Sequence, residues 1–185
     1  MNDLVRHRGP DDEGFLLFRS PESPALVCGG PDTPDESYRS RLSYSPADTI
    51  AAHVALPVTL ALGHRRLSII DLHVTGHQPM CTPDRRYWIV YNGEIYNYVE
   101  LRAELESLGY RFHSHSDTEV VLAAYACWGK ECLHRFNGMW AFAIYDTLRK
   151  DLFLARDRFG IKPLYYWIAP DGSFCFGSEI KQFTA

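Results

Sequence analysis

Two helix patterns follow one another in the middle of the chain, with short strand patterns on both sides of them. The first begins at Asn97, which stands three residues before Glu100 as in a capping box, and it ends at Gly109. The second runs from a capping box at residues 116–119 to Gly129. Strands grouped before and after a pair of helices predict an α+β fold with antiparallel sheets.

The strand predictions rest on short apolar or alternating runs bounded by turn residues. They cover residues 15–18, 50–62, 64–71, 87–91, 111–115, 139–145, 152–156, 164–168 and 174–176. In the run 64–71, alternation puts Arg66, Ser68 and Ile70 on one face and Arg65, Leu67 and Ile69 on the other. Asp171-Gly172 predicts a hairpin turn, and a short helix is predicted over 131–136.

Residues 20–49 differ from the rest of the chain. They hold five of the eleven prolines, with many Ser and Asp and little periodicity. We predict a long, partly disordered surface excursion here, within a single domain of 185 residues.

Charge and composition exclude several classes of protein. The net charge is -4 and no run of Lys or Arg occurs, so a nucleic-acid partner is not predicted. The longest apolar stretch, 54–62, is too short to span a bilayer, and residues 1–8 lack the apolar core of a signal peptide. Five scattered cysteines without a C-x-x-C pair predict neither a disulfide framework nor a zinc ribbon. These features favour a reducing, cytoplasmic setting.

An amide and a glycine follow the strand predicted over 87–91. Asn92 and the backbone N–H of Gly93 could together hold the oxygen of a small substrate. The alternative is an ordinary turn, because Asn-Gly pairs mark turns in proteins of every function.

Two charged side chains stand where a ligand could use them. Arg66 lies in an apolar strand, where its guanidinium requires a carboxylate: that of a ligand, or that of Asp71 in a structural pair. Asp117 in the first turn of a helix could bind a substrate ammonium, or could only interact with the helix dipole. Together with Asn92 and Gly93 they match the needs of a free amino acid with a reactive side-chain carbonyl.

Other kinds of site are not favoured. His113 and His115 share a strand face, but no cysteine or acidic cluster accompanies them, so no metal is predicted. The aromatic residues 165–167 are more typical of a core than of a base-stacking surface. No G-x-x-x-x-G-K phosphate loop occurs.

Six blocks in a fixed order carry a resemblance to a known family. They are His7-Arg8-Gly9-Pro10-Asp11, Gly63-His64-Arg65-Arg66-Leu67-Ser68-Ile69-Ile70-Asp71, Gly76-His77-Gln78-Pro79-Met80, Asn92-Gly93-Glu94-Ile95-Tyr96-Asn97, Ser116-Asp117-Thr118-Glu119 and the run 156–166. The chain resembles the glutaminase domain of glutamine-hydrolysing asparagine synthases, a class II glutamine amidotransferase. The resemblance covers nearly all of the chain except residues 20–49.

The resemblance implies an N-terminal-nucleophile hydrolase fold, a four-layer αββα sandwich of two antiparallel sheets. It implies L-glutamine as substrate and ammonia as product. Arg66 would bind the glutamine carboxylate, Asp117 with Gly93 the amino group, and Asn92 with Gly93 would form the oxyanion hole. The backbone near Ile69, Ile70 and Glu94 would line the pocket.

The family's nucleophile is a cysteine at the N-terminus, whose own amine serves as base. Here the sequence starts Met1-Asn2, and none of the five cysteines can take that place. We therefore expect a chain that lacks a strand inside one sheet, is marginally stable, and does not hydrolyse glutamine. The family's synthetase domain would follow residues 179–181 and would use ATP, so no cofactor is expected here.

Three functions stay open on this basis. The chain could be the glutaminase domain of an asparagine synthase, supplying ammonia to a fused or associated synthetase domain. It could be a pseudo-glutaminase that binds without chemistry. It could also serve another acceptor in sugar or nucleotide synthesis, which the Leu-Ser-Ile-Ile-Asp and Glu-Ile-Tyr-Asn blocks make less favoured. A homodimer is possible in each case.

Overall fold

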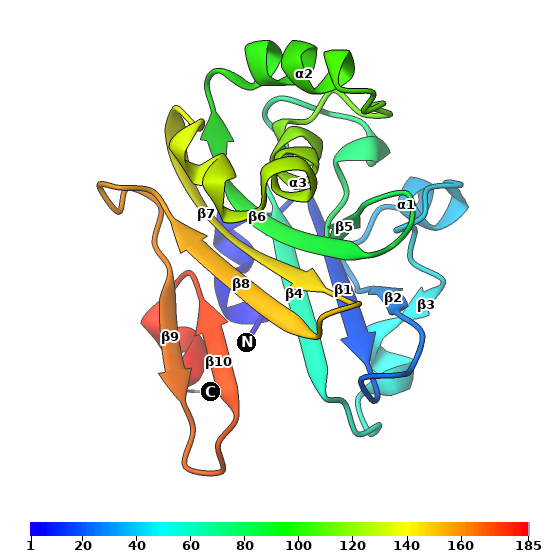
Figure 1. Cartoon of the computed structure of the whole chain (residues 1–185). Coiled ribbons are helices and arrows are strands. Elements are labelled where there is room, and N and C mark those ends of the chain that lie inside the picture. The colour runs from blue at the N-terminus through cyan, green and yellow to red at the C-terminus, as the bar shows by residue number, and fades with distance from the viewer. Residues whose placement is uncertain (185) are drawn as a thin grey trace.

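Two four-stranded sheets face each other in the computed structural model, which describes residues 1–184 (Figure 1). The first sheet has the order β3 (Asp48–Thr49), β2 (Leu26–Gly29), β1 (Asp12–Phe18), β4 (Leu60–Arg66). The second has the order β5 (Met80–Cys81), β6 (Tyr87–Ile95), β7 (Gly138–Asp146), β8 (Asp151–Arg156). All neighbours pair antiparallel except β2 and β3, which form a two-residue parallel pair.

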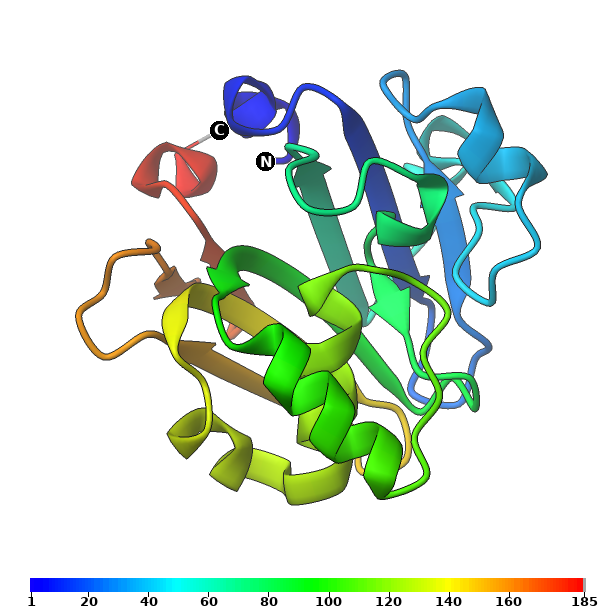
Figure 2. The same cartoon turned by 90° about the horizontal axis from the view of Figure 1, so that it is seen from above.

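Two helices cover the face of the second sheet that points away from the first (Figure 2). They are α2 (Tyr98–Ser107) and α3 (Asp117–Trp128). A separate hairpin of β9 (Tyr165–Ile168) and β10 (Phe174–Gly177) turns at Asp171-Gly172, as predicted. The remaining helical elements are short: η1 (Asp3–Arg8), α1 (Asp35–Arg39), η2 (Ile50–His53), η3 (Val74–Gly76), η4 (Gly129–His134) and η5 (Ile180–Phe183). The α+β prediction is confirmed.

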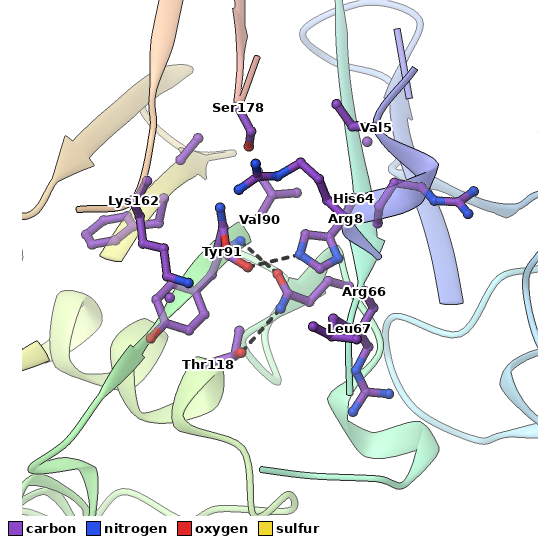
Figure 3. Close-up of a pocket in the computed structure, with 18 of the residues that line it drawn as sticks. Val5, Arg8, His64, Arg66, Leu67, Val90, Tyr91, Thr118, Lys162 and Ser178 are labelled. Carbon is purple, nitrogen blue, oxygen red and sulfur yellow. Dashed lines mark hydrogen bonds between the residues drawn. The ribbon is translucent and has the colours of Figure 1, made fainter. Parts of the chain in front are cut away.

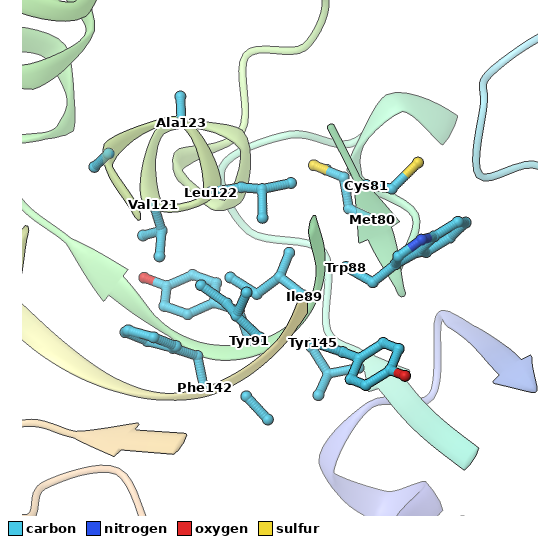
Figure 4. Close-up of a cluster of buried hydrophobic side chains, with 14 of the residues drawn as sticks. Met80, Cys81, Trp88, Ile89, Tyr91, Val121, Leu122, Ala123, Phe142 and Tyr145 are labelled. Carbon is cyan, nitrogen blue, oxygen red and sulfur yellow. The ribbon is translucent and has the colours of Figure 1, made fainter. Parts of the chain in front are cut away.

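The core joins the three layers. Phe18 of the first sheet meets Tyr145 of the second with ring centroids 5.2 Å apart. On the opposite face of the second sheet, Ile89 and Tyr91 pack beneath Val121 and Leu122 of α3 (Figure 4). Strand alternation produces this division, because successive residues of β6 point to opposite faces. No helix within residues 1–184 combines the length and the apolar composition that a membrane span requires.

Ser116 caps α3 as predicted, but Glu119 does not complete the predicted capping box, because its carboxylate accepts the N–H groups of His113 and Ser114. The predicted cap of α2 is not found. Ser116 caps α3 by accepting the N–H of Thr118 at 3.1 Å. Asn97 makes no capping bond; its amide instead donates to the Arg135 carbonyl at 3.0 Å and accepts the Asn137 N–H at 2.9 Å. The predicted capping box at Asn97 is therefore wrong, because a tertiary partner takes the side chain. Gly109 follows α2 with φ +95°, as a stop residue should.

One strand prediction is wrong, and two others extend beyond β4, for identifiable reasons. Residues 111–115 are a loop, because the Glu119 carboxylate accepts the N–H groups of His113 and Ser114 at 3.0 and 2.8 Å. Residues 50–59 form η2 and turns, and the strand starts only at Leu60. Residues 67–71 leave the sheet where the Ser68 N–H bonds to the Asp11 carboxylate at 2.8 Å.

Residues 20–49 are ordered, which corrects the prediction of a surface excursion. Strand β2 pairs with β1 and buries Val27 and Cys28. Tyr44 is 6% exposed, and its hydroxyl donates to the Thr75 carbonyl at 2.7 Å. A four-residue strand is too short for its periodicity to show among prolines.

The two neighbouring arginines of β4 lie on opposite faces, as predicted. Arg65 is buried in an ion-pair network: its guanidinium reaches Glu13 at 2.7 Å and Asp32 at 2.8 Å. It also donates to the Gly9 carbonyl at 3.0 Å, which ties the loop before β1 to the end of β4. Arg66 is thereby left on the face that looks toward the second sheet.

Candidate functional site

A cavity of about 530 Å³ lies between the end of β4, the edge of β6, the start of α3 and the loop after β8 (Figure 3). Six of the seven predicted site residues line it: Arg66, Ile69, Ile70, Asn92, Gly93 and Asp117. The seventh, Glu94, is not among the lining residues. It pairs with Met139 in the β6–β7 ladder. The structure thus brings together residues from four separate elements that sequence reasoning had associated.

The edge of β6 faces this cavity. The Tyr91 N–H donates to Gln78 Oε1 at 2.8 Å, and the Ile95 N–H donates to Asp117 Oδ2 at 3.0 Å. Both groups therefore point away from β7, and β5 pairs with β6 only at Trp88 and Ile89. Backbone N–H and C=O groups alternate in direction from one residue of a strand to the next. Those of Gly93 therefore point in the same direction as those of Tyr91 and Ile95, away from β7. They stand outside the β6–β7 ladder and open to the cavity.

Asn92 and Gly93 lie inside a strand, which corrects both the turn and the strand-end prediction. Asn92 is in register with Ala141 and Gly93 with Trp140. Since Tyr91 points to α3, the Asn92 side chain points to the opposite face, toward the cavity. A Cβ on Gly93 would lie 2.5 Å from the Met139 carbonyl oxygen. Packing against β7 thus requires a glycine here independently of any chemistry.

Asp117 is a buried carboxylate, 4% exposed, at the first position of α3. Its Oδ2 accepts the Tyr91 hydroxyl at 2.7 Å as well as the Ile95 N–H. Burial raises the pKa of Asp117, while these two hydrogen bonds favour its charged form. The helix dipole alone does not account for a carboxylate held in this way at a cavity wall.

Arg66 does not pair with the Asp71 carboxylate, so that alternative is wrong. Its guanidinium donates to the backbone carbonyls of His73, at 3.1 Å, and of Asp71. The Asp71 carboxylate instead accepts the His73 N–H at 2.9 Å and the Thr75 hydroxyl at 2.8 Å. Among residues 1–184, Arg66 has no carboxylate partner. Burial lowers its pKa, yet an arginine stays charged in proteins.

Sequence reasoning missed two polar supports of the cavity wall. His64 Nε2 bonds to the Tyr91 carbonyl at 2.9 Å, and its buried Nδ1 has no partner within the described chain. Gln78 accepts the Tyr91 N–H and donates to the Thr118 hydroxyl at 3.3 Å. His64 shares its strand face with Arg66, and that spacing of two was the available signal.

Lys162 also lines the cavity and was not singled out from the sequence. It stands in the block 156–166, which carries part of the resemblance. No group of three or more His, Cys, Asp or Glu side chains that could hold a metal ion occurs within the described residues.

Comparison with known proteins agrees with this geometry. Residues 39–185 match the family model of the glutamine amidotransferase domain. The chain is 41% identical over 182 residues to asparagine synthetase [glutamine-hydrolyzing] 1 of Bacillus subtilis, covering 98% of this chain and 22% of that protein. It is 36% identical over 200 residues to putative asparagine synthetase [glutamine-hydrolyzing] 2 of Methanocaldococcus jannaschii, covering 100% and 31%. The chain thus spans less than a third of either relative.

Among solved structures, the glutamine phosphoribosylpyrophosphate amidotransferase from B. subtilis superposes with a TM-score of 0.73. The match covers 97% of this chain and 38% of that one at 21% identity, and it supports the fold alone. The chain belongs to the class II glutamine amidotransferase domain family, and its sequence is similar to the glutaminase region of asparagine synthetases.

Proposed function

We propose that the cavity binds free L-glutamine and that this chain is the glutaminase domain of an asparagine synthetase-like protein. The observation that carries the proposal is the free edge of β6. There the N–H and C=O of Gly93 stand unpaired between two N–H groups that are held by Gln78 and Asp117. Arg66 and Asp117 line the same cavity. An unpaired N–H and C=O beside one cation and one carboxylate suit a small amino acid, which carries a carboxylate and an ammonium.

Each ligand group has a candidate partner in this arrangement. Arg66 would hold the α-carboxylate, since it is a cation without a carboxylate partner in the described chain. Asp117 and the Gly93 carbonyl would hold the α-ammonium. The Gly93 N–H and the Asn92 amide would face the side-chain carbonyl, where negative charge develops during amide hydrolysis. The loop with Ile69 and Ile70 would close over the ligand, with the backbone near Glu94 behind it.

The wider setting belongs to the same proposal. The names of the relatives couple glutamine hydrolysis to asparagine synthesis. In this proposal a synthetase domain, fused or associated, would use ATP and receive the ammonia in the cytoplasm. The proposal also includes the family's four-layer αββα arrangement, of which the two sheets and the layer of α2 and α3 are described here.

A second candidate is a pseudo-glutaminase that binds glutamine without hydrolysing it. The observation that favours it is that none of the five cysteines lines the cavity. Both candidates require the same binding site, and they differ only in turnover.

Calorimetric titration with glutamine tests the binding site. Arg66→Ala removes a charge-assisted contact worth about 2 to 3 kcal/mol, so we expect affinity to fall by about 30- to 150-fold. Asp117→Asn should weaken binding in a similar way by removing the partner of the ammonium. Arg111→Ala, an exposed arginine outside the cavity, is the matched control and should bind as the unsubstituted chain does. Equal affinity in Arg66→Ala and the unsubstituted chain would contradict the proposed role of Arg66, and no binding at millimolar glutamine would contradict the site.

A further inference from the structure

Lys162 has a fixed backbone and a free side chain. The Asp157 carboxylate accepts the N–H groups of Phe159, Ile161 and Lys162 at 3.1, 2.9 and 2.9 Å. The Lys162 carbonyl accepts Arg156 Nε at 2.7 Å. From this anchored position the side chain reaches into the cavity from the side opposite Arg66 (Figure 3). Within residues 1–184 its ammonium has no ion-pair partner.

The register of the second sheet places Lys162 relative to the other site residues. Asn92 is in register with Ala141, and Ala141 is in register with Arg156. The side chain of Arg156 donates a hydrogen bond to the Lys162 carbonyl. Neighbouring strands are about 4.8 Å apart, so Lys162 lies beyond Asn92 on the β8 side. Asp117 lies on the other side of Asn92, because it bonds to the free edge of β6.

This order gives the cavity a direction. A ligand whose ammonium meets Asp117 and whose side-chain carbonyl meets Asn92 and Gly93 extends its terminal group toward Lys162. Resting on the proposed function, we propose that Lys162 is a specificity-determining residue that pairs with the side-chain carboxylate of glutamate and so retains the product of hydrolysis.

The chemistry of the two amino acids explains the preference. Hydrolysis breaks the carbon–nitrogen bond of the carboxamide, water supplies the second oxygen, and the nitrogen leaves as ammonia. Glutamine therefore presents a neutral amide to Lys162, whereas glutamate presents an anion. A lysine ammonium can donate a hydrogen bond to either group, but it forms an ion pair only with the second. Product glutamate then competes with glutamine for the site.

Titration calorimetry with L-glutamine and L-glutamate tests the inference. We expect Lys162→Met, which keeps a linear apolar stem, to bind glutamate about tenfold more weakly and glutamine unchanged. Lys162→Arg keeps the charge and should retain the preference for glutamate. Lys130→Met removes a charge from an exposed position outside the cavity and should change neither affinity. Added salt should weaken glutamate binding relative to glutamine in the unsubstituted chain but not in Lys162→Met.

The outcomes separate this inference from the function on which it rests. Equal loss of both ligands in Lys162→Met would show a structural role and overturn it, as would an unchanged glutamate affinity. Either result leaves the glutamine site intact as long as Arg66→Ala weakens the binding of both amino acids as expected. Failure of both amino acids to bind the unsubstituted chain would overturn the proposed function and this inference together.

Discussion

His64 connects the two sheets at the cavity wall through one hydrogen bond, from its Nε2 to the Tyr91 carbonyl. Burial lowers the pKa of His64 to about 4, so the ring is neutral near pH 7. A neutral ring that donates from Nε2 leaves Nδ1 as an acceptor, which is the buried atom without a partner. The hydrogen bond keeps β6 in place beside β4, and with it the free edge at Gly93.

The pKa of His64 predicts a loss of stability in acid. The unfolded chain binds a proton below about pH 6.5, while the folded chain resists it down to about pH 4, so the free energy of unfolding falls as pH falls between these values. Between about pH 7 and pH 5 this contribution is about 2 kcal/mol. His64→Gln keeps a donor for the Tyr91 carbonyl and should remove this part of the pH dependence.

Urea unfolding at both pH values measures the difference. His134→Gln, at an exposed histidine, is the control and should keep the pH dependence of the unsubstituted chain. Parallel pH dependences in His64→Gln and the unsubstituted chain would show that His64 is not responsible.

At the scale of elements, β6 carries both the core and the site. Its first half, at Trp88 and Ile89, is paired on both edges, whereas its second half pairs only with β7. The strand continues through Gly93 because the missing side chain allows β7 to approach. One strand thus supplies a rigid wall and an unpaired backbone edge at the same residue.

Gly93→Ala tests how closely β7 approaches. The added Cβ would lie 2.5 Å from the Met139 carbonyl oxygen and 2.7 Å from the Trp140 Cα, both backbone atoms of β7. We expect the free energy of unfolding to fall by about 1 to 3 kcal/mol, as for other overpacked sites. Gly63→Ala in β4 is the matched control, since its Cβ would meet nothing closer than 3.4 Å, the Asn2 side chain. Equal denaturant midpoints for the two variants would contradict the prediction. They would mean that β6 and β7 can move apart to admit the Cβ without loss of folding free energy.

At the scale of the whole molecule, no cysteine of residues 1–184 lines the cavity. Cys28, Cys81 and Cys132 are buried elsewhere, and burial raises their pKa values to about 11, 11 and 12. The remaining cysteines, Cys127 and Cys175, do not line the cavity either. A thiolate is the nucleophile that thioester formation needs.

A protein of these 185 residues should therefore bind glutamine without hydrolysing it. The measurement is ammonia release from glutamine by the purified chain, with Asp117→Asn measured in parallel. Enzymes typically turn over at about 1 per second or faster. Release at such a rate that disappears in Asp117→Asn would contradict the prediction, whereas release that persists in Asp117→Asn comes from a contaminant.

Local signals were sufficient where the partner lies nearby in sequence. Ser116 caps α3 by accepting the N–H of Thr118, two residues away. Asp171-Gly172 closes a hairpin between the adjacent strands β9 and β10. The strands predicted over 139–145 and 152–156 correspond to β7 and β8. These two strands are adjacent in the sequence and pair directly with each other. The α+β class, the family and six residues that line the cavity were accessible from such patterns and from the order of the six blocks.

The tertiary structure decided everything that depends on a distant partner. Asn97, Glu119 and Arg66 each bind backbone groups that their sequence pattern did not indicate. The free edge at Gly93 follows from the register of β6 with β7, in which Gly93 pairs with Trp140, and the position of Lys162 also depends on this register. Gly93 and Trp140 are distant in the sequence, so local propensity carries no information about their pairing. By itself the sequence indicated six of the residues that line the cavity. Folding determined the direction in which each group points, because backbone direction and burial are properties of paired strands and not of single residues.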